Sequence, residues 1–144
     1  MFNHNEFAKE HHERIINKGY WKDPKELGTL LMLVVTEITK LFDKDRVNKS
    51  EKLADIALRL YDLCGYYKID LTELPHVKSC TLYDMLSMLT NELEATRVNM
   101  PTNWIYLKRC LSMTWFYASL NRIDLKKELN RKSAILVHME TKKF

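Results

Sequence analysis

The sequence of 144 residues carries a formal net charge of +4, with 46% hydrophobic and 29% charged residues. This balance excludes a disordered chain and predicts a single globular domain over residues 1–144. Only three glycines and three prolines are present, too few for the turns of a β-sandwich or barrel, so the predicted fold class is an all-α bundle. The longest apolar run, 30–35, is far too short for a membrane span, and the N-terminus lacks the apolar core of a signal peptide. We therefore expect a cytoplasmic protein without membrane contact.

Hydrophobic spacing predicts a bundle of about six helices. In chain order they cover residues 6–18, 24–44, 50–67, 82–93, 104–120 and 125–140. The second and third have the clearest pattern, because apolar side chains recur every three or four residues along both. Pro24 suits the start of the second helix, and Ser50 is the expected N-cap of the third. A short connection between two such helices predicts an antiparallel pair.

The second half of the chain, 79–140, is similar to the first at an offset of 54 residues. The matching apolar positions are Leu53, Ile56, Ala57, Leu63 and Cys64 against Leu107, Cys110, Leu111, Tyr117 and Ala118. An internal repeat of two helix–loop–helix units is one interpretation, and chance matching of amphipathic helices is the other. The helix at 104–120 is apolar on nearly every side, so we expect it to be the central helix of the bundle.

Three stretches of the first half carry a family resemblance. They are His12-Glu13 with Lys18-Gly19-Tyr20-Trp21 and Asp23-Pro24, then Gly28 with the apolar run to Glu37, then Leu53-Ala54-Asp55-Ile56 with Arg59-Leu60, Asp62-Leu63 and Ile69-Asp70-Leu71. Over residues 12–71 the chain resembles the MazG-like branch of the all-α nucleoside triphosphate pyrophosphohydrolases. Against the short members of that family, 79–140 is a divergent second half.

The resemblance implies a Mg²⁺ site built from an ExxE…ExxD pattern on two antiparallel helices, at which an NTP or dNTP is split into a nucleoside monophosphate and pyrophosphate. Residues three apart share a helical face, so two facing helices can direct their carboxylates to one cation. Glu37 and Asp55 occupy the first and last positions and are the candidate catalytic residues and metal ligands. Lys40 and Lys52 occupy the two middle positions, and Glu51 is the candidate third metal ligand.

Basic and aromatic side chains supply the candidate nucleotide contacts. Lys40 and Lys52 can hold phosphates as point charges, and Lys132 matches the phosphate-contacting lysine of the family. Trp21 is a candidate for stacking on the base, with core packing as the alternative. Between the two long helices, the residues at 37, 40, 52 and 55 are expected to neutralise one another as crossed ion pairs, unless they are ordinary charges on separate surfaces.

Three functions follow from this pattern. The first is a nucleotide-binding protein with impaired or lost hydrolysis, acting as a sensor, sequestering protein or scaffold, because a lysine ammonium repels Mg²⁺. The second is an active Mg²⁺-dependent pyrophosphohydrolase. The third is an adaptor for a protein or nucleic acid that uses the basic C-terminal segment, although a nucleic-acid partner is disfavoured. A homo-oligomer is expected from the family, unless the internal repeat satisfies the same surfaces within one chain.

Overall fold

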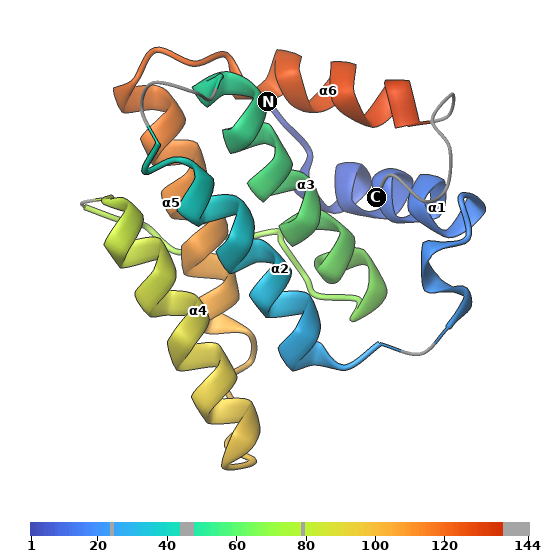
Figure 1. Cartoon of the computed structure of the whole chain (residues 1–144), viewed down its shortest axis with the longest axis vertical. Coiled ribbons are helices and arrows are strands. Elements are labelled where there is room, and N and C mark those ends of the chain that lie inside the picture. The colour runs from blue at the N-terminus through green and yellow to red at the C-terminus, as the bar shows by residue number, and fades with distance from the viewer. Residues whose placement is uncertain (24, 44–47, 79, 137–144) are drawn as a thin grey trace.

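The computed structural model describes residues 1–23, 25–43, 48–78 and 80–136. In these ranges the chain forms six α-helices and one short 3-10 helix, and no strand (Figure 1). The elements are α1 (His4–Asn17), η1 (Tyr20–Lys22), α2 (Leu27–Lys40), α3 (Lys49–Tyr66), α4 (Leu82–Arg97), α5 (Ile105–Leu120) and α6 (Leu125–Ile135). The prediction of an all-α bundle is confirmed. None of the helices in the described ranges has both the length and the apolar character to span a membrane.

Helix α3 lies at the centre of the bundle. It packs against α1, α2, α5 and α6, and ten of its 18 residues are buried. The expectation that the helix at 104–120 is central was wrong, because α5 packs mainly against α4 and α3 and leaves aromatic side chains such as Phe116 and Tyr117 partly exposed. Large aromatic rings can cover a core from its edge, so apolar residues on every side of a helix do not require a central position.

The two long helices of the first half run antiparallel, as predicted, with shorter limits (Figure 1). Helix α2 begins at Leu27 because Glu26 is still extended. Helix α3 begins at Lys49, and its N-cap is Asn48 rather than Ser50, because the Asn48 side chain accepts a hydrogen bond from the Glu51 amide at 3.2 Å. The predicted ends of these helices at residues 24 and 44 lie outside the described residues, as does the predicted end of the last helix beyond residue 136.

Helices α3 and α5 end in the same geometry, 54 residues apart. Lys68 and Arg122 have left-handed backbones, with φ of 54° and 55°. The next residues, Ile69 and Ile123, donate from their amides to the carbonyl oxygens five residues earlier, at 2.9 and 2.8 Å. This is the hydrogen-bond pattern of a Schellman helix end. Helix α4 ends in the same way, with Asn99 at φ 58° and the Met100 amide donating to the Ala95 carbonyl at 2.8 Å, so this shared geometry does not decide between an internal repeat and chance matching.

A buried glutamate joins α4 to the start of α5. Glu92 is 1% exposed, and its carboxylate accepts hydrogen bonds from the Thr102 hydroxyl at 2.7 Å and the Leu107 amide at 3.3 Å. An anion is stabilised there because the first amides of a helix carry partial positive charge and have no intrahelical acceptor. Glu92 thus holds α4 against the start of α5, and it does not line the cleft described below.

Candidate functional site

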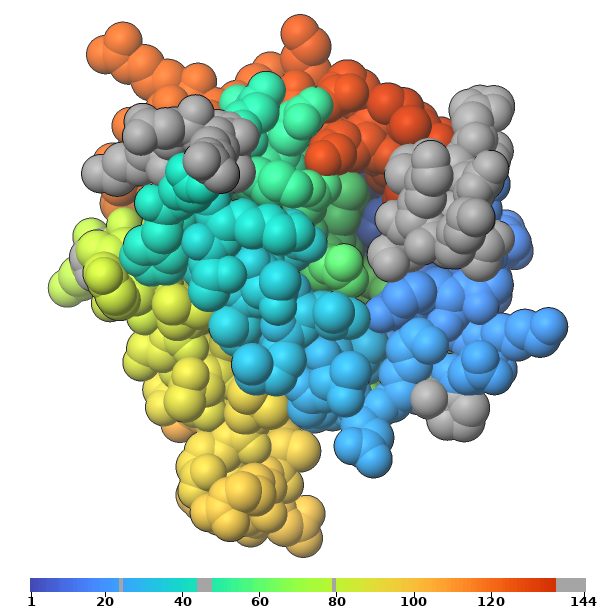
Figure 2. All heavy atoms as spheres, viewed as in Figure 1, coloured from blue at the N-terminus to red at the C-terminus, as the bar shows by residue number. Residues whose placement is uncertain are grey.

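A cleft of about 500 Å³ opens between α1, α2, α3 and α6. In Figure 2 the surface is hollowed between α2 in cyan and α6 in red, with α3 in green seen deeper. The lining residues are His11, Ile15, Tyr20, Glu37, Lys52, Asp55, Leu58, Arg59, Asp62, Arg131, Lys132, Ile135 and Leu136. Four of the seven residues that the sequence put forward as site residues, at positions 37, 52, 55 and 132, are therefore together in one cleft.

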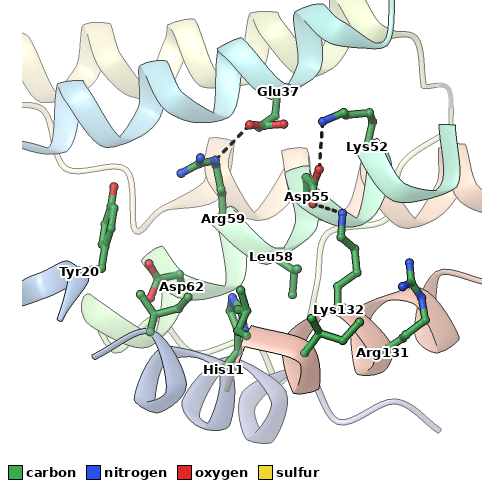
Figure 3. Close-up of a pocket in the computed structure, with 13 residues that line it drawn as sticks. His11, Tyr20, Glu37, Lys52, Asp55, Leu58, Arg59, Asp62, Arg131 and Lys132 are labelled. Atoms are coloured by element: carbon green, nitrogen blue, oxygen red, sulfur yellow. Dashed lines mark hydrogen bonds and ion pairs between the residues drawn. The ribbon is translucent and has the colours of Figure 1, made fainter. Parts of the chain in front are cut away.

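Asp55 lies between two lysines from different helices. Its carboxylate is 3.4 Å from Nζ of Lys52, one turn earlier on α3, and 2.5 Å from Nζ of Lys132 on α6 (Figure 3). Lys132 also donates to the backbone carbonyl of Glu51 at 3.4 Å. The two ammonium groups are held at one end of the cleft, and Asp55 keeps them there.

Glu37 is likewise held between two cations. Its Oε1 is 3.3 Å from Nζ of Lys40 and 3.6 Å from Nε of Arg59. The residue is only 7% exposed, and its Oε2 is buried without a hydrogen-bond partner among the described residues. The Arg59 contact joins α3 to α2 and appears in Figure 3 beside the Asp55 pairs.

The expected crossed ion pairs do not form between α2 and α3. Lys40 pairs with Glu37 and Lys52 pairs with Asp55, each three residues away on its own helix. The i,i+3 spacing already brings these side chains together, so no reach across the helix interface is needed. The link between the two helices is made instead by Arg59, whose contact with Glu37 the sequence did not predict.

The three candidate metal ligands are not brought together. The carboxylate of Glu51 pairs with Arg131 at 3.4 Å, away from the Lys52 and Lys132 contacts of Asp55. Among the described residues, no group of three or more His, Cys, Asp or Glu side chains is arranged to hold a metal ion. The groups next to Glu37 and Asp55 are lysine and arginine side chains rather than further oxygen ligands for a metal.

Trp21 and Lys40 lie outside the lining of the cleft. The Trp21 ring stacks on Tyr66 with centroids 4.0 Å apart, and its indole nitrogen donates to both carboxylate oxygens of Asp62 at 3.1 Å. This packing is the alternative that the sequence had left open for Trp21. The Lys40 side chain is 44% exposed and pairs with the same oxygen of Glu37 that Arg59 contacts.

Asp62 belongs to the cleft although the sequence did not put it forward as a site residue. It accepts a hydrogen bond from Nδ1 of His12 at 2.6 Å as well as those from Trp21. Burial raises the pKa of the Asp62 carboxyl, and the contacts with His12 and Trp21 oppose that rise. These partners come from α1 and η1, whereas Asp62 itself belongs to α3, so Asp62 ties the N-terminal segment to the wall of the cleft.

The remaining lining is apolar or uncharged. Ile15, Leu58, Ile135 and Leu136 provide hydrocarbon surface next to the charged end. His11 is 2% exposed, and burial lowers its pKa to about 3, so the ring is neutral at physiological pH. Nδ1 of His11 lies 2.8 Å from the Ser133 hydroxyl, which joins α1 to α6. The charged end at Lys52, Asp55 and Lys132 is therefore bordered by uncharged side chains, and Arg59 and Asp62 add further charges elsewhere in the lining.

The low pKa of His11 predicts a loss of stability in mild acid. Below pH 6.5 the unfolded chain takes up a proton at this residue, whereas the folded chain does not until about pH 3. The contribution of neutral His11 to the free energy of unfolding is therefore complete above pH 6.5. It declines as the pH falls, by up to about 1.4 kcal/mol per pH unit. Denaturant unfolding from pH 7 to pH 4 should show a flatter pH dependence for His11→Gln than for the wild type, and an unchanged slope would contradict the assignment. The exposed His76→Gln is the matched control.

Comparisons with family models, curated proteins and solved structures find no match to this chain. The case for a function consequently depends on the chemistry of the cleft.

Proposed function

We propose that this protein binds a nucleotide in the cleft and has lost efficient pyrophosphohydrolase activity, as a divergent relative of the MazG-like family. One observation carries the proposal: the two carboxylates expected to hold the catalytic metal are each held between two protein cations. These cations lie next to the carboxylates, at the positions where a metal-dependent enzyme of this kind needs oxygen ligands. They also supply the positive charge that a phosphate requires.

The residues present do not fit a magnesium ion. Mg²⁺ demands near-octahedral oxygen coordination, and its protein ligands are carboxylates that are free to face it. Asp55 already contacts Lys52 and Lys132, and one oxygen of Glu37 contacts Lys40 and Arg59. The other Glu37 oxygen is a single, solvent-inaccessible atom and does not make a coordination site. A divalent cation placed here would also meet the repulsion of the neighbouring ammonium groups.

The cleft suits a molecule that combines an anionic group with an uncharged part. Lys52 and Lys132 converge from α3 and α6 and can donate to the same phosphate, while Arg131 lies near them on α6 (Figure 3). Leu58 and the neutral ring of His11 adjoin this charged end and offer an uncharged surface to a base or sugar. Pockets for small ligands commonly combine such an apolar wall with a few polar groups that fix orientation.

The proposal is tested by measuring binding and cleavage on the same preparation. A panel of nucleotides should raise the unfolding temperature saturably in the presence of EDTA, since a ligand that binds only the folded state stabilises it. Pyrophosphate release from NTPs and dNTPs should stay near background with or without Mg²⁺. Sustained Mg²⁺-dependent release would instead show an active pyrophosphohydrolase. If no nucleotide raises the unfolding temperature, nucleotide binding is excluded and the adaptor function is favoured.

A further inference from the structure

The charges that line the cleft nearly cancel. Four cations face it together with three carboxylates, which leaves a surplus of one positive charge. The cations are Lys52, Arg59, Arg131 and Lys132, and the carboxylates are Glu37, Asp55 and Asp62. His11, the titratable ring in the lining, is buried and neutral and adds nothing. Such a balance suits a small anionic group rather than a highly charged one.

All three carboxylates are already engaged by protein groups. Asp62 receives hydrogen bonds from His12 and Trp21, and the other two carboxylates are held by lysines and an arginine. A triphosphate usually enters a protein site with Mg²⁺, and the ion is shared between the phosphates and one or two protein carboxylates. In this cleft the carboxylates would have to leave their cations to take that role.

We infer that the ligand of this cleft is a nucleoside monophosphate that binds without a divalent cation. This inference rests on the proposed function and narrows its ligand class. A phosphate monoester carries a charge of about −1.5 to −2 at neutral pH. The surplus of one positive charge compensates much of it, while the two converging lysines donate hydrogen bonds to its oxygens. Each further phosphate would add negative charge beyond the surplus of one positive charge in the lining.

Asp55 determines how much negative charge the cleft accepts. It holds the ammonium groups of Lys52 and Lys132 close together, so a phosphate can contact both. At the same time its own negative charge opposes every additional phosphate that approaches them. Asp55 therefore acts as a specificity-determining residue for the number of phosphates.

The test compares ligands of different charge by calorimetric titration of the full chain. The probes are the four ribonucleoside 5′-monophosphates and their triphosphates in EDTA, the triphosphates with Mg²⁺, and ribose 5-phosphate and adenosine alone. At least one monophosphate should bind more tightly than its triphosphate under either condition. Ribose 5-phosphate and adenosine then show how much of the affinity comes from the phosphate and how much from the base.

The variant Asp55→Asn should shift this preference. Removing one negative charge at roughly 4 Å from the phosphate should strengthen binding of the metal-free triphosphate about fivefold, and that of the monophosphate less. Glu94→Gln makes the same charge change at an exposed position on α4, where Glu94 pairs with Arg97, and should alter neither affinity.

Two results would overturn the inference. Tighter binding of the Mg²⁺-triphosphate than of every monophosphate would overturn it and leave nucleotide binding intact. Failure of every nucleotide to bind would overturn the proposed function together with the inference. If Asp55→Asn does not fold, the wild-type comparison of monophosphate with triphosphate decides the matter alone.

Discussion

Gly65→Ala is expected to lower the free energy of unfolding by about 1–3 kcal/mol, the range for inserting a methyl group into a close-packed interior. Gly65 lies in the last turn of α3, where α1 crosses it closely. An added Cβ would lie 2.4 Å from Cβ of His12 and 2.8 Å from the backbone carbonyl of Ala8. Neither is the end of a flexible side chain, so α1 would have to move as a unit. Because His12 holds Asp62 in the wall of the cleft, the displacement should also weaken ligand binding.

Gly28→Ala provides the matched control for this substitution. Its new Cβ would meet Cδ2 of Leu93 at 3.7 Å, an ordinary contact, so stability should be unchanged or should rise by up to about 1 kcal/mol from helix propensity. Urea unfolding followed by circular dichroism measures both variants. A Gly65→Ala protein as stable as Gly28→Ala would show that α1 does not pack against α3 as closely as described.

Lys132→Ala is expected to weaken nucleotide binding roughly tenfold to a hundredfold, the effect of losing one hydrogen bond to a charged group. Lys132 extends from α6 to the charged end of the cleft, where it contacts Asp55. Its removal takes away one of the two converging ammonium groups and leaves the Asp55 charge less compensated. Both changes disfavour an anionic ligand.

Lys126→Ala serves as the control, because Lys126 is exposed on the same helix and does not line the cleft. It makes the same change in net charge and should leave the affinity close to that of the wild type. Calorimetric titration of both variants with the nucleotide that binds the wild type best gives the comparison. Equal losses in the two variants would mean that only the overall positive charge attracts the ligand.

The helices could be predicted from the sequence because their apolar residues follow the period of the α-helix closely. Their arrangement could not be predicted in the same way. The strongly apolar segment at 104–120 was expected at the centre, yet α3 occupies that position because α1, α2, α5 and α6 all pack on it. Which side of an apolar helix is covered depends on its neighbours, and the period of a single helix carries no information about them.

The part of the candidate site that the sequence put forward came from residues at motif positions. Glu37, Lys52, Asp55 and Lys132 came from a family resemblance and lie in one cleft. The contact of Arg59 with Glu37 was missed because it joins two different helices, and helical spacing indicates only partners within one helix. The hydrogen bonds of Asp62 join residues 41 and 50 positions apart, and no local spacing signals such contacts.

The most direct measurement is a crystal structure of the protein grown in EDTA with a saturating nucleotide. Our account predicts a phosphate within hydrogen-bond distance of Nζ of both Lys52 and Lys132, with the base against Leu58 and His11. A nucleotide bound elsewhere on the surface, or one that enters the cleft only when Mg²⁺ is supplied and bridges it to Glu37 and Asp55, would contradict it.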